Sequence, residues 1–453
     1  MKEKCGIYGI YSKSYSENII IDTIRGLELL QHRGQEGCGL VYLDNNHKYN
    51  LNKGAGLVKD VFNKSNFKIA SNMVIGHVRY STSGQSKIKD TSVYDECQPL
   101  FGECNLGSFY LAHNGNIPNL TIHDTQYIVQ YLEKDMSNTW RQKLISLLET
   151  IPCAYCLLII TKECIYALRD RFGIRPLCIG INEDKYCLSS ETCALDKYNF
   201  LTNINPGEIV KLNNYGVNLI YSSYRSKLSI CSFEFIYFLN INSICDNYAV
   251  KDVRSKLAIK LAEKERLLNI NDYIVIGIPD SGVYYGMEYA KYLNLNYCQF
   301  ITKNKKINRT FILPSDEERN NACLKKFTYD SENLKDKKVI IIDDSIVRGN
   351  IIRAIIKNLW ECNVDEIHIR IPSAPVIDRC RLGIDIANKD ELLAYNRTIE
   401  DIKNKLNINS IRYVTYNEMS SILPEHSNKE CFGENLTSDM LSINNKNDFC
   451  EIF

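Results

Sequence analysis

The stretch KVIIIDDSIVRGN, residues 338–350, decides the fold of this chain. Four apolar residues, 339–342, predict a buried strand that ends in two adjacent carboxylates, Asp343 and Asp344. Ligands of open α/β sheets bind at that end of a strand. The loop 345–349 then leads into a helical stretch, and backbone N–H groups at the start of a helix suit a phosphate. The paired carboxylates suit ribose hydroxyls or a Mg²⁺ held jointly with phosphate. A lone Asp-Asp pair would more simply be two solvated side chains, but with SIVRG attached the stretch predicts a site for a phosphorylated ribose.

The region around this stretch alternates apolar strands with helical stretches. YIVIGIPD (273–280) precedes SGVYYGMEYAKYL (281–293), just as the strand at 339–342 precedes its own helical stretch. Continuous apolar strands that alternate with helices predict a parallel sheet covered on both faces. The second half is therefore expected to be an α/β parallel-sheet domain.

The first half of the chain has a different pattern. Short apolar or alternating runs such as MVIGHVRYS (73–81) and CLLIITKECIYAL (156–168) predict strands separated by Gly and Asn turns. Two helical stretches interrupt them: residues 22–33, with Asp22 as the expected N-cap, and residues 124–135. This pattern predicts a layered α+β domain.

Composition narrows the class of protein. The 453 residues suffice for about two to three domains. The 55 Lys and Arg balance 54 Asp and Glu, and this net charge of +1 argues against nucleic acid or a membrane as partner and favours a small-molecule substrate. The N-terminal residues lack the apolar region of a signal peptide, and no stretch approaches about 18 uncharged apolar residues. With its 18 Cys expected to be reduced thiols, the chain is predicted to be cytoplasmic.

Cys5, in the opening MKEKCGIYGI, is a candidate nucleophile. Taken singly, each cysteine is most simply a small buried hydrophobe. Removal of residues 1–4, however, would leave a thiol and a free α-amine about 3 Å apart, and an amine with a pKa near 8 can act as the thiol's general base. The chain is accordingly expected to comprise a propeptide (1–4), the layered α+β domain (5–230), the α/β domain (231–420) and a polar tail (421–453) that packs over the domains or is partly disordered.

VIIIDDSIVRG (339–349) resembles the ribose-phosphate loop of type I phosphoribosyltransferases, specifically that of the glutamine phosphoribosylpyrophosphate amidotransferase family. IGIPDSG (276–282) resembles the family's earlier strand end, and KNKKINRTFILP (303–314) resembles its mobile lid. A lid keeps water from the departing pyrophosphate and the oxocarbenium-like ribose of phosphoribosyl pyrophosphate (PRPP). In the lid, Lys303, Asn304 and Arg309 match the family. The resemblance implies Mg²⁺ binding by Ser281, Asp343 and Asp344, and PRPP binding by Lys303, Arg309, Asp343, Asp344, Ser345, Ile346, Val347, Arg348 and Gly349.

The chain departs from the family pattern around this site. Asn350 and Ile351 stand where the family usually has two hydroxyl residues, and this removes two side-chain donors from the phosphate loop. In the lid, Lys305 and Lys306 replace the usual Arg and Tyr, and Asn308 replaces a Gly. Because backbone donors remain, we expect weakened substrate binding before loss of activity.

Four motifs in the first half resemble the N-terminal-nucleophile (Ntn) hydrolase glutaminase domain of the same family, an αββα fold. They are CGIYGI (5–10), LLQHRGQEGCGL (29–40), GHVRYSTSG (76–84) and LAHNGN (111–116). The shorter stretches RDRFGIRPLCIG, LSSETCALD and NPGEI extend the resemblance, which covers residues 5 to about 420.

The resemblance implies a role for each residue needed to hydrolyse a carboxamide. Cys5 is the nucleophile, and the side-chain amide of Asn114 with the backbone N–H of Gly115 forms the oxyanion hole, a use of an Asn-Gly turn. Arg79 holds the α-carboxylate of glutamine and Asp124 its α-ammonium. Singly, Arg79 could be a surface arginine on a strand and Asn114-Gly115 a hairpin turn. The matching motifs also contain two residues expected to support the site, Arg33 and His77.

Three cysteines match ligands of the [4Fe-4S] cluster that one branch of the family carries: Cys231, Cys380 and Cys431. The fourth ligand position falls on Asn428, a poor substitute for a thiolate. Two readings stay open, a labile or water-ligated cluster and three buried thiols, of which the second is simpler.

The resemblance implies transfer of ammonia from glutamine to PRPP, giving 5-phosphoribosylamine, with Mg²⁺ as cofactor, purine nucleotides as inhibitors and a homo-oligomer, dimer or tetramer. A hexosamine-forming amidotransferase would carry sugar-isomerase domains in place of VIIIDDSIVRG. A catalytically weak nucleotide-sensing or assembly protein is the rival from another class, and Asn350, Ile351 and Asn428 favour it.

Overall fold

The structure is a computed structural model that describes residues 5–64, 67–80, 93–117, 120, 122–151, 153–304, 326–382 and 388–435. Several expectations lie outside the described residues: those for residues 1–4 and 436–453 and for Lys305, Lys306, Asn308 and Arg309.

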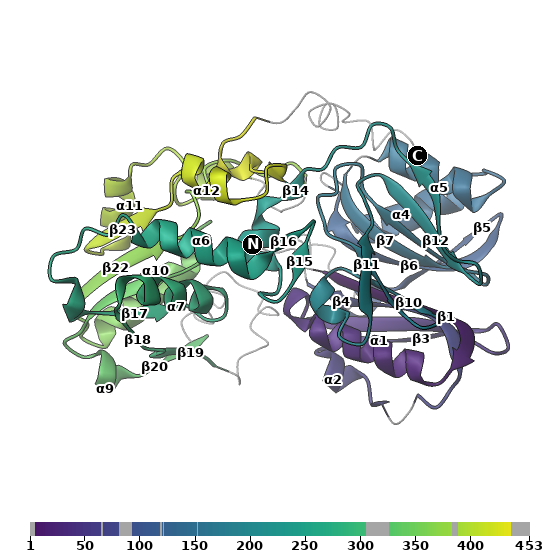
Figure 1. The fold of residues 1–453 in the computed structure, drawn as a ribbon, viewed down its shortest axis with the longest axis horizontal. Coiled ribbons are helices and arrows are strands. Elements are labelled where there is room, and N and C mark those ends of the chain that lie inside the picture. The colour runs from purple at the N-terminus through teal and green to yellow at the C-terminus, as the bar shows by residue number, and fades with distance from the viewer. Residues whose placement is uncertain are drawn as a thin grey trace.

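A seven-stranded antiparallel sheet forms one layer of the first half (Figure 1). Its strand β1 begins directly after Cys5 and lies inside the sheet, between β10 and β4. In spatial order the strands are β11 (Asn199–Asn203), β9 (Cys178–Asn182), β10 (Lys185–Ser189), β1 (Gly6–Ser16), β4 (Ser71–Arg79), β2 (Gly37–Asp44) and β3 (Tyr49–Ala55).

A six-stranded antiparallel sheet packs against the first one. Buried side chains from both sheets, such as Ile7 and Ile75 on one side and Ala112 and Leu158 on the other, form a single apolar cluster between them. In spatial order its strands are β13 (Gly216–Ser222), β12 (Glu208–Asn213), β8 (Ile165–Arg169), β7 (Ala154–Ile160), β6 (Gly107–Asn116) and β5 (Leu100–Cys104).

Helices cover the outer faces of both sheets. Helix α1 (Asn18–Leu29) packs on the seven-stranded sheet, and α4 (Asp124–Lys134) and α5 (Trp140–Thr150) pack on the six-stranded sheet (Figure 1). The short helices α2 (Val58–Val61) and α3 (Val93–Glu96) lie in the connections. The expected αββα layering is therefore confirmed.

The start predicted for the first helix is wrong. Helix α1 begins at Asn18, so Asp22 lies inside the helix and caps nothing. The residues before Asp22 include Ile19 and Ile20, which are buried on the same helical face as Ile24. Burial of this apolar face extends the helix by one turn beyond the local capping signal.

The second half contains a five-stranded parallel sheet. The predicted strand at 339–342 is its central strand, β21, and alternate residues of β21 face opposite clusters: Val339 and Ile341 one, Ile340 and Ile342 the other. Both faces are buried, which explains the uninterrupted apolar run. The sheet order is β18 (Asn296–Tyr297), β17 (Tyr273–Gly277), β21 (Lys338–Ile342), β22 (Glu366–Ile371) and β23 (Ser410–Tyr413).

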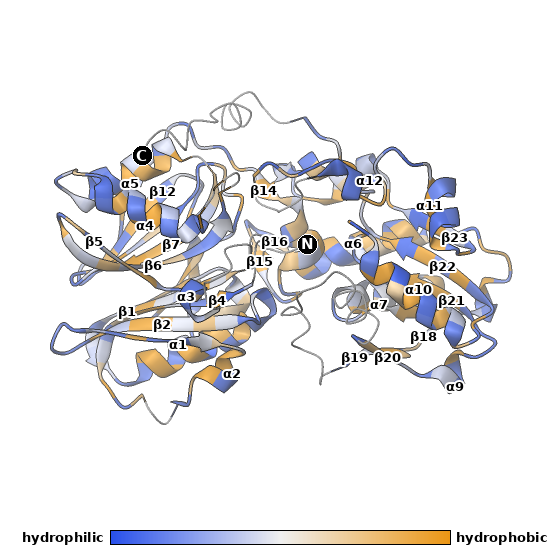
Figure 2. Cartoon of the chain, turned by 180° about the vertical axis from the view of Figure 1, so that it is seen from behind, coloured by the Kyte–Doolittle hydropathy of each residue, from blue (hydrophilic) through white to orange (hydrophobic). Residues whose placement is uncertain are grey.

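Helices line the two faces of this sheet. On one face lie α6 (Val250–Ala262), α7 (Ser281–Leu293) and α12 (Tyr416–Ile422); on the other lie α10 (Asn350–Glu361) and α11 (Ile399–Leu406). Hydrophobic and hydrophilic residues alternate along α10 in Figure 2, as expected for a helix with one buried face. The expected α/β parallel-sheet architecture is confirmed. The remaining elements are the strand pair β19 (Ile301–Lys303) and β20 (Phe327–Tyr329), the strand pair β15 (Ile244–Cys245) and β16 (Tyr248–Ala249), and α9 (Ser331–Leu334).

The C-terminal segment packs where the two halves meet. Strand β24 (Ser427–Asn428) pairs in parallel with β14 (Ile230–Cys231), and the ring of Phe432 stacks on that of Phe233 with centroids 5.2 Å apart. The π-helical segment η4 (Glu234–Phe238) follows β14 directly. One continuous apolar cluster, which includes Phe233 and Phe432, joins the cores of both halves.

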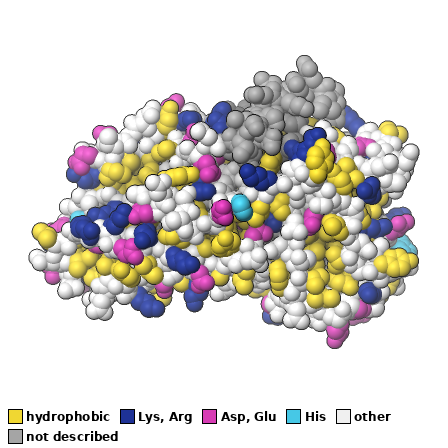
Figure 3. Space-filling view, turned by 45° about the horizontal axis from the view of Figure 1, so that its top comes forward, with side chains coloured by type: hydrophobic (Ala, Val, Ile, Leu, Met, Phe, Trp, Pro, Cys, Tyr) yellow, Lys and Arg dark blue, Asp and Glu magenta, His cyan; other side chains and the backbone are white. Residues whose placement is uncertain are grey.

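On the face shown in Figure 3, acidic and basic side chains are interspersed. Within the described ranges, no helix has both the length and the apolar character needed to cross a membrane.

Candidate active sites

The loops after β17 and β21 meet at one edge of the parallel sheet. The backbone N–H of Ile278 donates to the carbonyl of Ile342 at 2.8 Å. A Cβ on Gly282 would lie 2.4 Å from the same carbonyl oxygen, so this close approach requires glycine. The contact sets the N-terminus of α7, where Ser281 is the first residue, against the end of β21. The structure thus brings the two motifs predicted to bind PRPP together.

Asp343 and Asp344 lie at the end of β21 as the sequence predicts. The backbone N–H of Asp344 donates to Asp343 Oδ1 (2.9 Å), and the hydroxyl of Ser345 donates to Asp344 Oδ1 (3.0 Å). Burial and the neighbouring carboxylate of Asp344 raise the pKa of Asp343 well above its usual value. The two carboxyl groups are neighbours and repel each other when both are ionised. A bound divalent cation would stabilise their ionised forms.

The loop after these carboxylates is held at both ends. Gly349 adopts φ +79° directly before α10, a conformation that favours glycine. The carbonyl of Val347 accepts a hydrogen bond from the N–H of Leu393 (2.8 Å), and Arg348 Nε lies 2.5 Å from a carboxylate oxygen of Glu391. The side chain of Ile346 is buried in the core. These anchors present the first turn of α10 as a fixed row of N–H donors.

The two unusual residues of the loop begin α10. Asn350 Oδ1 accepts a hydrogen bond from Arg353 (3.1 Å), and Ile351 is 39% exposed. The side chain of Asn350 is therefore engaged with its own helix, and that of Ile351 offers no polar group.

The described part of the lid begins beside Ser281. Lys303 ends β19, and its ammonium lies 2.7 Å from a carboxylate oxygen of Asp280, the residue before Ser281. The backbone N–H of Asn304 donates to the carbonyl of Lys326 (2.9 Å), which joins the two ends of the connection.

A cavity of about 430 Å³ lies between the two halves next to this loop. Its lining includes Gln31, Gln35 and Leu57 of the first half and Asp280, Ile301 and Lys303 of the second.

Cys5 lies at the other candidate site, at the start of β1, and is 8% exposed. Its thiol contacts the carbonyl of Tyr80 at 3.7 Å, and its own carbonyl accepts a hydrogen bond from Arg33 Nε at 3.0 Å. Because Gly6 pairs with Val78 on β4, Cys5 lies beside the end of that strand.

Asn114 and Gly115 lie in strand β6, opposite Cys156 and Tyr155 on β7, so the expectation of an Asn-Gly turn is wrong. The glycine is required here for packing, since a Cβ on Gly115 would lie 2.1 Å from the carbonyl oxygen of Ala154.

The side chain of Asn114 is tied to the start of β1 through Ser190. The amide of Asn114 donates to Ser190 Oγ (3.4 Å), which also accepts from the N–H of Ile7 (3.0 Å). The residue predicted for the oxyanion hole is therefore positioned by the strand that carries Cys5.

Arg79 and Asp124 both lie in charged surroundings. Arg79, the last residue of β4, is 7% exposed and pairs with the carboxylates of Glu36 and Glu96. Asp124 begins α4, where its Oδ1 accepts the N–H of Thr125 (2.7 Å) and its Oδ2 lies 3.7 Å from the ring of His113. A guanidinium can bind the α-carboxylate of an amino acid, and a carboxylate can bind its α-ammonium. Arg79 and Asp124 therefore supply the two types of group that an amino acid needs.

The two residues expected to support the site are fully buried. Burial and the neighbouring His113 and Arg79 hold the pKa of His77 well below its usual value, so its ring is neutral at pH 7. Arg33 forms the centre of a buried polar network with Glu191 and Glu234.

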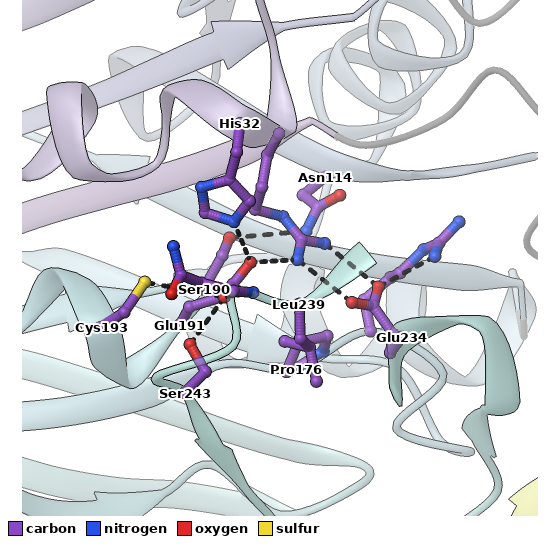
Figure 4. Close-up of polar contacts among 12 residues, drawn as sticks. His32, Asn114, Pro176, Ser190, Glu191, Cys193, Glu234, Leu239 and Ser243 are labelled. Atoms are coloured by element: carbon purple, nitrogen blue, oxygen red, sulfur yellow. Dashed lines mark hydrogen bonds and ion pairs between the residues drawn. The ribbon is translucent and has the colours of Figure 1, made fainter. Parts of the chain in front are cut away.

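Sequence reasoning missed several residues of that network. Ser190 and Glu191 follow β10, and Glu234 lies in η4 (Figure 4). A signal was present for Glu234, which interrupts an apolar run in FEFIYF, whereas Glu191 follows two serines in CLSSE and carries no such signal. Charged residues in such runs are buried only when paired.

The three candidate iron ligands converge near β14. Burial raises the pKa of Cys231 to about 12, and burial, Cys380 and Cys231 together raise that of Cys431 well above its usual value. The fourth position does not fit the cluster: Asn428 pairs with Cys231 through the backbone, and its side-chain oxygen accepts the N–H of Glu430 at 3.1 Å. A [4Fe-4S] cluster held by four thiolates therefore does not match this donor set.

One other group of potential ligands lies close together in the described part of the chain: His32, Glu191 and Cys193, whose ligand atoms lie within 4.8 Å of one another. The carboxylate of Glu191, however, already accepts hydrogen bonds from His32 and Arg33, and a cation would lie beside the guanidinium. We assign no metal to this group.

Comparison with known proteins shows the family of the chain. A family model described as phosphoribosyl transferase domain matches residues 240–376. The amidophosphoribosyltransferase of Rattus norvegicus is 34% identical over 92% of this chain and 88% of its own length. A structure of the Bacillus subtilis glutamine PRPP amidotransferase in complex with ADP and GMP matches with a TM-score of 0.79 at 32% identity, over 92% of each chain. A structure described as the allosteric regulatory enzyme of purine biosynthesis matches with a TM-score of 0.82 at 31% identity, over 96% of this chain and 97% of the other. The chain belongs to the amidophosphoribosyltransferase family, which joins a glutamine amidotransferase to a phosphoribosyltransferase.

Proposed function

We propose that this chain hydrolyses glutamine at Cys5 and transfers the ammonia to PRPP at the loop after β21, giving 5-phosphoribosylamine, glutamate and pyrophosphate in the first step of de novo purine synthesis. The observation that carries the proposal is the cavity between the halves, which residues of both halves line. It lies next to Asp280 and Lys303 of the proposed PRPP site and is also lined by Gln31 and Gln35, in one of the motifs that resemble the glutaminase domain.

In the first reaction, the α-amine of Cys5 takes the thiol proton and the sulfur attacks the carboxamide carbon of glutamine. Asn114 and the N–H of Gly115 stabilise the oxyanion, and Arg79 and Asp124 hold the amino-acid end. The α-ammonium then gives this proton to the departing nitrogen, so collapse of the tetrahedral intermediate breaks the C–N bond, releases ammonia and leaves a thioester, which water hydrolyses to glutamate.

In the second reaction, ammonia forms a bond to the ribose carbon as the bond to pyrophosphate breaks. The N–H groups of the loop 345–349 bind the 5′-phosphate, and Asp343 and Asp344 face the ribose hydroxyls. Bound Mg²⁺, held by these carboxylates near Ser281, would supply charge neutralisation for the pyrophosphate. The lid, with Lys303 and Arg309, excludes water.

The same proposal extends to partners and location. Purine nucleotides act as inhibitors, which the ADP and GMP complex of the Bacillus subtilis relative supports. We also propose that the protein forms a homo-oligomer, a dimer or a tetramer, and that it is cytoplasmic.

A catalytically weakened homologue is the second candidate. The apolar, exposed Ile351 at the phosphate loop favours it. Failure of the unaltered protein to release pyrophosphate from PRPP with Mg²⁺ and either glutamine or ammonia would support this candidate.

Cys5→Ala should abolish glutamine-dependent synthesis and leave ammonia-dependent synthesis within about twofold, because only the second site is needed once ammonia is supplied. Glutamate and pyrophosphate are followed together. Cys104→Ala, at the end of β5, is the matched control and should change neither activity. Equal loss of both activities in folded Cys5→Ala would refute the two-site assignment.

Asp344→Asn should reduce synthesis with either nitrogen source about tenfold or more, because it removes charge from the edge that binds ribose and Mg²⁺. Pyrophosphate release gives the rate. Asp365→Asn makes the same change on an exposed residue at the opposite end of the sheet, just before β22, and should be neutral. An undiminished rate in Asp344→Asn would remove this carboxylate from the site.

Active protein should begin at Cys5, because the amide nitrogen that joins Lys4 to Cys5 has no basic lone pair to accept the thiol proton. Intact-mass measurement on active enzyme decides this. Full glutamine-dependent activity with residues 1–4 retained would exclude the free-amine mechanism.

Asn428→Cys should allow a [4Fe-4S] cluster to form, since it supplies the fourth thiolate beside Cys231, Cys380 and Cys431. Iron and sulfide are counted after anaerobic reconstitution, with Asn428→Ser as control. We expect about four irons per chain in the cysteine variant and fewer in the other two proteins; a full complement in the unaltered protein would contradict the three-thiol assignment.

A further inference from the structure

Four charged side chains form a connected network in the interior, and Figure 4 labels its two acids, Glu191 and Glu234. Arg33 pairs with Glu191 (2.6 Å) and, through both terminal nitrogens, with the two oxygens of Glu234 (3.1 Å each). Arg175 also donates to Glu234, at 2.9 Å. All four side chains are at most 2% exposed.

Charge balance explains how these groups remain ionised in the interior. Burial opposes the charge of Arg33, but Glu234 and Glu191 outweigh it and raise the pKa of Arg33 above its usual value. Burial would likewise raise the pKa of Glu191, but His32 and Arg33 hold it far below. Removal of one member would leave an uncompensated charge among apolar side chains.

One end of the network reaches the backbone of the nucleophile. With its terminal nitrogens committed to Glu191 and Glu234, the guanidinium of Arg33 has a fixed orientation, and its Nε–H donates to the carbonyl of Cys5 at 3.0 Å. Side-chain motion of Arg33 would therefore move the residue that carries the thiol and the α-amine.

The other end reaches the segment that leads into the second half. Glu234 begins η4, in which the carbonyl of Ile236 accepts a hydrogen bond from Tyr285 on α7 (2.9 Å) and that of Phe235 accepts one from Arg254 on α6 (2.8 Å). Helix α7 is the helix that begins at Ser281.

We infer that Glu234 is a positioning residue for glutamine hydrolysis. It orients Arg33, which in turn fixes the backbone of Cys5. The first site is therefore complete only when η4 is docked against the second half. The inference rests on the proposed role of Cys5 as nucleophile. A bidentate pair suits this role because a planar guanidinium held at both terminal nitrogens cannot rotate.

Glu234→Gln is the test. A carboxamide of nearly the same size offers one acceptor oxygen in place of two and brings a donor against a guanidinium, so Arg33 loses its fixed orientation. The kcat for glutamine hydrolysis should fall about 10- to 100-fold, since misplacement of a reacting group by about 1 Å costs this much. The KM for glutamine should stay within about twofold, because Arg79 and Asp124 do not contact Glu234, and ammonia-dependent synthesis should also stay within about twofold.

The matched control is Asp246→Asn. Asp246 accepts both terminal nitrogens of Arg169, at 3.2 and 3.0 Å, and this pair also joins a strand of the first half to the segment after η4 without contacting Cys5. Asp246→Asn should lower the melting temperature while it leaves the kcat for glutamine hydrolysis unchanged. An equal loss of kcat in both variants would overturn the inference, because general loosening of the junction would then explain it.

Two further results settle the inference. Unchanged kcat in folded Glu234→Gln, measured beside an inactive Cys5→Ala, would refute the positioning role and leave the nucleophile assignment intact. If Glu234→Gln does not fold, Arg33→Lys replaces it: the charge is kept but the Nε–H donor to Cys5 is lost, so kcat should again fall with KM preserved. Unchanged kcat in folded Arg33→Lys would equally refute the role.

Discussion

Glu234 carries a negative charge into the interior at the point where the two halves meet, and the need to compensate that charge constrains how they meet. An uncompensated buried carboxylate would cost several kcal/mol. Both compensating guanidiniums, of Arg33 and Arg175, belong to the first half, while Glu234 lies in the segment that leads into the second. The segment must therefore dock in the register that places Glu234 between them. The stacked rings of Phe233 and Phe432 then bring the C-terminal segment to the same junction.

The two sites depend on the fold in different ways. Cys5 directly precedes β1, which is paired on both sides within the seven-stranded sheet, and Arg33 Nε holds the carbonyl of Cys5. Asp343 and Asp344 follow a strand buried on both faces and lie at the edge of the sheet where the loops after β17 and β21 meet. A nucleophile needs a fixed position, whereas a site that admits a bulky diphosphate needs an edge that can open.

Sequence patterns predicted the elements whose signal is local. The strand at 339–342 and its parallel sheet could be predicted because burial on both faces leaves an uninterrupted apolar run. The start of α1 was wrong because burial of Ile19 and Ile20 outweighs the capping tendency of Asp22. The turn expected at Asn114-Gly115 was wrong because the glycine is needed for close packing against β7.

Residues whose role depends on distant partners could not be predicted in the same way. Glu191 and Glu234 stand 158 and 201 residues from Arg33 along the chain. The sequence shows that Glu234 is a charge in an apolar run, but it does not show which cation compensates either carboxylate. The same limit applies to Ser190, which joins Asn114 to β1 although 76 residues separate the two side chains.

The position of the cavity gives these constraints a chemical meaning. Ammonia that escapes into water at neutral pH takes up a proton and loses the lone pair that would attack the ribose carbon. The cavity bounded by Gln31 and Leu57 on one side and Lys303 on the other lies between the two halves. Because both halves line it, its shape depends on how they dock, and the charge compensation at Glu234 constrains that docking.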